Sequence, residues 1–154
     1  MSIRQTIPAL LWAFCLPLSL LAQQNKLIVS PAEPLTVKRG GTASSMLKVA
    51  TLPGFHVNSN KPKDEFLIPL TLTWTSGPLE TISVVYPPPQ DLKVGNDILS
   101  VLTGTFQIET QFKAGEKPPA GPSAMVGKLH YQACNNQMCF RPSTVEVRVP
   151  VVVE

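Results

Sequence analysis

Two cysteines near the C-terminus, Cys134 and Cys139, are the residues of this 154-residue sequence best suited to chemistry. Four residues separate them, Asn135 to Met138, and strand-like sequence precedes and follows the pair. Asparagine tolerates the left-handed backbone of tight loops, so a short loop here can bring the two sulfurs within bonding distance. The spacing therefore allows a disulfide, a redox-active dithiol or a soft-metal site.

These three interpretations stay open when the residues alone are considered. A structural disulfide is common in exported proteins, although a six-residue ring contributes only about 2 kcal/mol. Redox exchange needs a thiolate, which Arg141 or a protonated His56 or His130 would favour. A soft-metal site would combine the cysteines with Met138 and a histidine, and would suit Cu(I) or zinc. The spacing is not the CxxC of thioredoxins, so it does not by itself select redox exchange.

The first 22 residues have the pattern of a secretory signal peptide. Arg4 gives a positive start, Ile7–Leu21 is an apolar run, and Ala22 is a small residue at the expected cleavage point. The run is too short for a membrane span, and no cysteine follows Ala22 to carry a lipid. We expect cleavage to remove Cys15 and to leave a single domain over residues 23–154, periplasmic or otherwise exported, with no further membrane span.

Charge and motif content exclude several function classes. The 13 basic and 10 acidic residues give a net charge of +3, which falls to +2 without Arg4. This charge is too small and too scattered for binding to nucleic acid or to an anionic membrane surface. The sequence contains no Gly-rich phosphate loop, nucleophile elbow or metalloprotease helix. We therefore expect no organic cofactor. We also expect no stoichiometric zinc or copper in the protein with its disulfide formed, because oxidised cysteines are poor metal ligands.

The rest of the chain is divided into short segments rich in β-branched residues. Fourteen of the sixteen prolines and all nine glycines lie in it, and several segments alternate apolar with polar residues. The clearest strands are expected over 67–75, 101–112 and 144–153, whereas Gln90–Leu99 is expected to be a loop. The pattern predicts an all-β, immunoglobulin-like antiparallel β-sandwich from about Leu27 to Val153. Its expected core includes Leu70, Leu72, Trp74, Val84, Phe106 and Ile108.

Several segments occur together in a recognisable order. Tyr131–Cys134 and Cys139–Pro142 frame the cysteine loop, and Gly54–Pro62 and Phe66–Pro69 precede it. Tyr86–Pro87 is followed by Leu99–Ser100–Val101. Together these segments resemble the N-terminal periplasmic domain of the DsbD family, the bacterial thiol:disulfide interchange proteins. The likeness spans about 35–153, and the cysteine loop combined with Gly54–Pro62 is its most specific part.

The resemblance implies an immunoglobulin-like domain that relays electrons through its cysteine pair. The donor would be a thioredoxin-like domain or protein, and here a separate protein, because this sequence lacks the family's membrane and thioredoxin-like domains. The acceptors would be periplasmic disulfide isomerases or the thioredoxin-like proteins of cytochrome c maturation. The activity implied is that of an electron-relay domain of a protein-disulfide reductase. An interaction domain with a purely structural disulfide, or a copper-binding module, is the alternative.

The resemblance also assigns expected roles to individual residues. Cys139 matches the cysteine that attacks and Cys134 its resolving partner, while His56 and Asn58 fall where the family places side chains beside the pair. The flanking residues expected to neighbour or shield the pair are Tyr131, Phe140, Arg141 and Pro142.

The family often covers its cysteines with a loop that carries an aromatic residue. The matching segment here, about 90–99, has no aromatic residue. Leu92, Val94, Ile98 or Leu99 would therefore have to cover the sulfurs.

Overall fold

The computed structural model describes residues 25–117 and 123–154. Within those two ranges the chain forms twelve strands and no helix, and hence none that could cross a membrane. The expected signal peptide, residues 1–22 with Cys15, lies outside the described residues. Its cleavage therefore stays a prediction.

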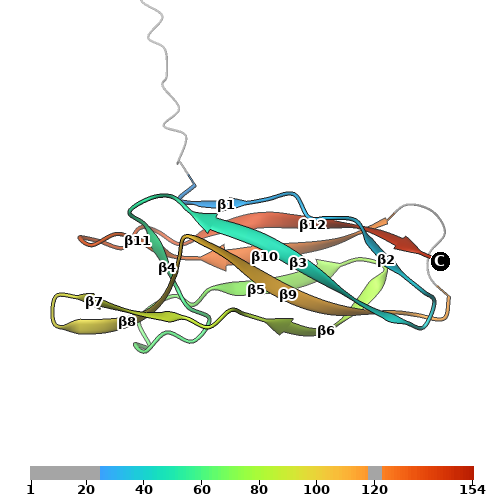
Figure 1. Cartoon of the computed structure of the whole chain (residues 1–154), viewed down its shortest axis with the longest axis horizontal. Coiled ribbons are helices and arrows are strands. Elements are labelled where there is room, and N and C mark those ends of the chain that lie inside the picture. The colour runs from blue at the N-terminus through green and yellow to red at the C-terminus, as the bar shows by residue number, and fades with distance from the viewer. Residues whose placement is uncertain (1–24, 118–122) are drawn as a thin grey trace, which may run out of the picture.

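The strands form three four-stranded sheets (Figure 1). Sheet A has the order β1-β3-β9-β6, sheet B the order β2-β12-β10-β5, and sheet C the order β11-β4-β8-β7. Every pairing is antiparallel except the parallel contact of β2 with the end of β12. The strand bounds are β1 (Leu27–Val29), β2 (Leu35–Val37), β3 (Thr42–Thr51), β4 (His56–Asn58), β5 (Thr71–Ser76), β6 (Leu79–Val85), β7 (Gln90–Val94), β8 (Asp97–Thr103), β9 (Thr105–Ala114), β10 (Ser123–Tyr131), β11 (Ala133–Cys134) and β12 (Ser143–Val153).

Sheets A and B lie face to face as a sandwich, and sheet C extends it at one end (Figure 1). The main core cluster draws buried side chains from both layers, such as Leu47 and Ile108 from sheet A and Leu72 and Leu129 from sheet B. The all-β sandwich is therefore confirmed. Of the six expected core residues, Leu70, Leu72, Phe106 and Ile108 are buried, and Trp74 and Val84 pack partly buried against the core.

The strand expected over 67–75 begins later than expected, at Thr71. Pro69 has no N–H that could donate to a neighbouring strand, and the backbone groups of Ile68 are hydrogen-bonded to side chains. The Ile68 carbonyl accepts from the Asn58 side chain at 2.9 Å, and its N–H donates to the Gln132 side chain at 3.4 Å. The backbone of Ile68 is therefore hydrogen-bonded to side chains near the cysteines and not to a strand of sheet B.

The loop expected over Gln90–Leu99 is in fact a hairpin of β7 and β8. Val94 pairs with Asp97, so the connection is the two-residue segment Gly95-Asn96. Gly95 has a φ of 61°, the positive value that such tight hairpin loops require at their first central position. The expectation of a loop was wrong, because a Gly-Asn pair between two short apolar segments is itself a hairpin signal.

Residues 101–112, expected to form one strand, are divided between two sheets. β8 ends at Thr103 in sheet C, and β9 begins at Thr105 in sheet A. Gly104 between them has a φ of 66°, which glycine adopts without the clash that a Cβ would cause. Its N–H donates to Thr51 Oγ1, and its carbonyl accepts from the Thr51 N–H, each at 2.9 Å. This turn lets sheet C diverge from the sandwich and carry the cysteine-bearing β11 at one end.

Candidate functional site

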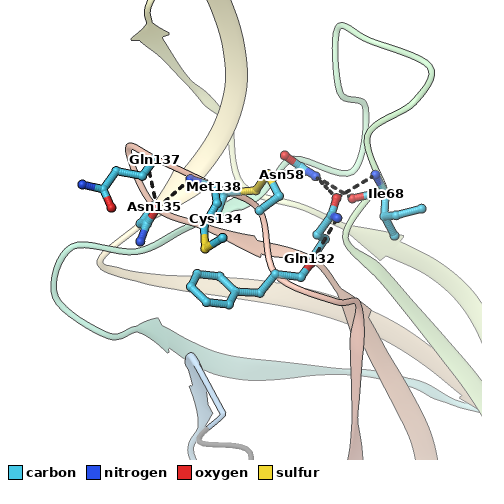
Figure 2. The surroundings of a disulfide bond; sticks show 9 residues. Asn58, Ile68, Gln132, Cys134, Asn135, Gln137 and Met138 are labelled. Atoms are coloured by element: carbon cyan, nitrogen blue, oxygen red, sulfur yellow. Dashed lines mark hydrogen bonds between the residues drawn. A yellow bond between two sulfur atoms is a disulfide. The ribbon is translucent and has the colours of Figure 1, made fainter.

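Cys134 and Cys139 form a disulfide across a tight β-hairpin (Figure 2). Cys134 ends β11, and Cys139 lies opposite it as an isolated antiparallel bridge with 4.0 Å between the Cα atoms. On one side of the pair, the Phe140 N–H donates to the Ala133 carbonyl at 2.8 Å. Such non-hydrogen-bonded pairs bring the facing side chains closest together. The hairpin backbone therefore juxtaposes the sulfurs, as the sequence predicted.

The four-residue loop between the cysteines is fixed by Asn135. Its N–H donates to the Met138 carbonyl at 2.9 Å and closes the hairpin on the other side of the disulfide. Its side-chain oxygen accepts from the N–H groups of Gln137 at 2.9 Å and Met138 at 2.8 Å. This is an Asx-type turn, in which a side chain replaces a backbone acceptor. The loop is thus shaped by its own first residue (Figure 2).

The two cysteines differ sharply in exposure. Cys134 is 1% exposed, whereas Cys139 is exposed, and its neighbour Met138 is 57% exposed. This inequality agrees with the expectation that the cysteine ending a strand is the more enclosed one. Of the two cysteines, Cys139 is therefore the residue that an approaching protein can contact.

His56 lies on β4 directly opposite Cys134 in the strand register. The side chain is 3% exposed, and its Nε2 has no hydrogen-bond partner. Burial lowers the pKa of His56 below its usual value of 6.5, so the imidazole is neutral at pH 7. His56 is therefore beside the pair as expected. Desolvation disfavours the charged form of His56 beside the disulfide, and a role for a protonated His56 in favouring a thiolate in the dithiol form stays a prediction.

His130, the other histidine considered, lies in sheet B and not in sheet C. Its Nδ1 is hydrogen-bonded to Thr144 Oγ1 at 2.9 Å across the β10–β12 pair. The structure brings only His56 onto the strand next to β11.

Asn58 is 1% exposed and belongs to a small polar network beside the disulfide (Figure 2). Its Nδ2 donates to the Ile68 carbonyl at 2.9 Å and to Gln132 Oε1 at 3.3 Å. The Gln132 Nε2 in turn donates to the Phe140 carbonyl at 3.2 Å. No role was expected for Gln132, although its place two residues before Cys134 is a signal that points to it.

Phe140 contacts two residues that the sequence did not connect to the site. Its ring centroid is 5.7 Å from that of Phe55, and Lys26 Nζ lies 5.4 Å from the Phe140 centroid and 5.5 Å from the Phe55 centroid. An ammonium at such distances is attracted to the faces of aromatic rings. Lys26, Phe55 and Phe140 thus form a compact cluster beside Cys139. Nothing in the local sequence links Lys26 to a residue so far along the chain.

Of the other residues expected to flank the pair, one is buried and two are exposed. Tyr131 is 2% exposed and packs in the main core cluster, and burial raises the pKa of its phenol. Its hydroxyl lies near Ser143 but makes no well-formed hydrogen bond. Arg141 and Pro142 are exposed just after Cys139. Tyr131 therefore supports the site from within, and the effect of Arg141 on the Cys139 thiol stays a prediction.

The β7–β8 hairpin leaves Cys139 uncovered. β4 and β8 lie between β11 and β7, so β7 is about 14 Å from β11 in the plane of sheet C. Ile98 near the hairpin tip is 53% exposed. The hairpin carries the four residues considered as a cover, yet Cys139 stays exposed.

Among residues 25–117 and 123–154, no group of three or more His, Cys, Asp or Glu side chains is arranged to hold a metal ion.

Comparison with known proteins gives matches among solved structures. No family model matches the chain, and no curated protein matches it. Among solved structures, the N-terminal periplasmic domain of ScsB from Proteus mirabilis superposes with a TM-score of 0.54 at 16% identity. The chain has the fold of that domain. The match covers 77% of this chain, and the chain spans 43% of the length of the ScsB chain.

Two further solved structures overlap more loosely. The DsbD N-terminal domain of Neisseria meningitidis, in its reduced form, has a TM-score of 0.39 at 13% identity, over 69% of this chain and 75% of that one. A PapD-like domain of human CEP192 has a TM-score of 0.42 at 11% identity, over 100% and 96%. The ScsB domain therefore carries the fold assignment, and at 16% identity it establishes the fold alone.

The buried imidazole of His56 should make the fold less stable in acid. Its pKa is lowered in the folded state, so the unfolded chain takes up a proton first as the pH falls through about 6.5. Stability is unaffected by His56 above that pH. Below it, we expect a loss of up to about 1.4 kcal/mol per pH unit until the folded-state pKa is reached.

Urea unfolding of the disulfide form between pH 7.5 and 5 measures this effect. In His56→Gln the acid-dependent loss should shrink. His130→Gln is the matched control, since it removes the only other histidine of the chain. The account of His56 fails if the wild type and His56→Gln lose stability in parallel.

Proposed function

We propose that this chain is an exported thiol–disulfide exchange module that relays electrons between proteins. The single observation that carries the proposal is the unequal exposure of the pair, with Cys139 exposed and Cys134 1% exposed. Exchange through a mixed disulfide needs one sulfur that a partner can reach and a second sulfur beside it that resolves the mixed disulfide. The ScsB-like fold and the segments that resemble the DsbD family support the same function.

The exchange would pass through two displacements. The Cys139 thiolate attacks one sulfur of an acceptor disulfide, and the second acceptor sulfur leaves as a thiolate. The Cys134 thiolate then attacks Cys139 Sγ, and the first acceptor sulfur leaves in turn. Two electrons pass to the acceptor, whose thiolates take up the two protons lost by the pair through solvent. The pair ends as the disulfide found here, and a donor dithiol reduces it again by the reverse steps.

The partners of this relay follow from the same chemistry. The donor would be a thioredoxin-like protein, and the acceptors would be disulfide isomerases or thioredoxin-like proteins in the periplasm. The exposed hairpin tip with Met138 suits them, because an approaching protein can contact Cys139 without unfolding the sandwich. The module itself would act as a protein-disulfide reductase only together with its donor.

The reduction potential of the pair distinguishes exchange from a structural bridge. We expect a value above about −300 mV, because bridges with lower potentials resist the ordinary thiol reductants. The measurement is equilibration of the purified protein in dithiothreitol or glutathione buffers of known ratio, followed by labelling of free thiols. Cys139→Ser, which cannot form the bridge, sets the labelling baseline. A potential well below −300 mV would assign the disulfide to structure and make an interaction domain the better interpretation.

A further inference from the structure

The Gln132 side chain joins three separate parts of the cysteine end of the molecule. Its Oε1 accepts from Asn58 Nδ2 at 3.3 Å and from the Ile68 N–H at 3.4 Å, while its Nε2 donates to the Phe140 carbonyl at 3.2 Å. Asn58 is itself tied to the Ile68 carbonyl. Gln132 thus connects β4, the segment before β5 and the residue after Cys139 (Figure 2).

The partners fix which way the Gln132 amide points. The Ile68 N–H can only donate, so it requires the amide oxygen of Gln132. The Phe140 carbonyl can only accept, so it requires the amide nitrogen. A flipped amide would lose both bonds, which leaves one orientation. The amide nitrogen of Gln132 therefore donates to the carbonyl of Phe140, the residue next to Cys139.

The bond to Phe140 matters most when the disulfide is open. Phe140 is held at its N–H by the Ala133 carbonyl and at its carbonyl by Gln132. In the disulfide form the S–S bond already fixes Cys139 opposite Cys134. In the dithiol form that bond is absent, and the place of Cys139 depends on these hydrogen bonds together with the bond from the Asn135 N–H to the Met138 carbonyl. Gln132 adds to the hairpin's own bonds a contact anchored in β4.

We propose that Gln132 is a positioning residue, which holds Cys139 opposite Cys134 in the reduced form through the Phe140 carbonyl. The inference rests on the proposed exchange function. Keeping two reactants in place raises their effective concentration, so Gln132 favours ring closure. Its loss frees the dithiol more than the disulfide, which shifts the equilibrium toward the dithiol. It also slows the attack of Cys134 on a mixed disulfide at Cys139.

Two substitutions isolate the donor end of the amide. Gln132→Glu keeps oxygen acceptors for Asn58 and Ile68 but cannot donate to the Phe140 carbonyl at neutral pH. Gln132→Met has a similar length, no charge and no hydrogen bonds of this kind. The loss of the donor is common to both variants, so a shared shift cannot come from the added charge of Glu. Gln111→Glu and Gln111→Met, at an exposed position of β9, are the matched controls.

The expected result is a roughly threefold to tenfold change in the dithiol–disulfide equilibrium of both Gln132 variants, the range for one hydrogen bond. For two electrons this makes the potential about 14 to 30 mV less negative. Release of a chromophoric thiol from a mixed disulfide at Cys139 should slow by a similar factor. A residue with a merely structural role would destabilise both redox forms equally and leave the potential unchanged.

The outcomes separate the two ideas. Gln132 variants whose potentials and release rates equal those of the Gln111 variants, beside a wild-type pair that exchanges normally, overturn the positioning role alone. A wild-type pair that resists exchange altogether overturns the proposed function, and the positioning role with it. A shift in Gln132→Glu without one in Gln132→Met assigns the effect to charge and also overturns the inference.

Discussion

Cys134→Ser should accumulate a mixed disulfide through Cys139, whereas Cys139→Ser should accumulate little. Cys139 is exposed on the hairpin, so it can reach a partner's disulfide. With Cys134 replaced, nothing resolves the adduct. In the converse variant the remaining sulfur belongs to Cys134, a residue that is 1% exposed in the disulfide form, so we expect a partner to reach it only if the hairpin opens. We expect the yields to differ by at least an order of magnitude.

The experiment expresses both variants in an exporting host and detects adducts that disappear on reduction. A thioredoxin-like protein should be recovered from the Cys134→Ser adduct. The double variant, with both cysteines replaced by serine, is the control for non-covalent association. Equal trapping by the single variants would contradict the assigned direction of attack. No adduct from either would favour a structural disulfide.

Phe112→Ala should cost the fold about 3–5 kcal/mol of unfolding free energy. Phe112 is fully buried on β9 and packs edge to face on Trp74, with 5.0 Å between the ring centroids. Removing the ring leaves a cavity that the surrounding strands can fill only in part. The measurement is urea unfolding of the disulfide form, in which the midpoint should fall while the slope stays the same.

Phe66→Ala is the matched control for this substitution. Phe66 is 85% exposed, so its truncation should change the unfolding free energy by no more than about 0.5 kcal/mol. Similar losses from Phe66→Ala and Phe112→Ala would contradict the placement of the core between the sheets. A loss in Phe112→Ala below about 1 kcal/mol would do so as well, because cavities in packed cores cost more than that.

The sandwich could be predicted because its strands carry a local signal. In β5, Leu72 is buried and Trp74 half-buried between exposed threonines, and β12 alternates valines with Glu146 and Arg148. Alternation with a period of two indicates a strand with one buried face, whatever the strand later pairs with. The β7–β8 hairpin was missed although Gly95-Asn96 signals it locally. That error concerned turn chemistry and not long-range packing.

The site could be predicted only in part. The disulfide and the place of His56 and Asn58 beside it follow from the residues and the family resemblance. The neutral state of His56 does not, because it depends on burial that several strands produce together. Lys26 reaches Phe140 only through the folding of β1 beside the turn before β4, where the Lys26 carbonyl accepts from the Leu52 N–H at 3.0 Å. Such contacts carry no local sequence signal.

The pairing of β10 with β12 has a consequence for the proposed redox exchange. Nine residue pairs, from Ser123 with Val151 to Tyr131 with Ser143, join the two strands that flank the cysteine segment. The disulfide closes a ring of only six residues, and this ring lies within the connection whose two ends the ladder already holds together. The entropic contribution of the disulfide to the stability of the fold is therefore only about 2 kcal/mol. We therefore expect the ladder to stay intact when the disulfide is reduced. In the proposed exchange the domain would then gain and lose electrons with its strands in place, and a cellular protease would meet nearly the same substrate in either state.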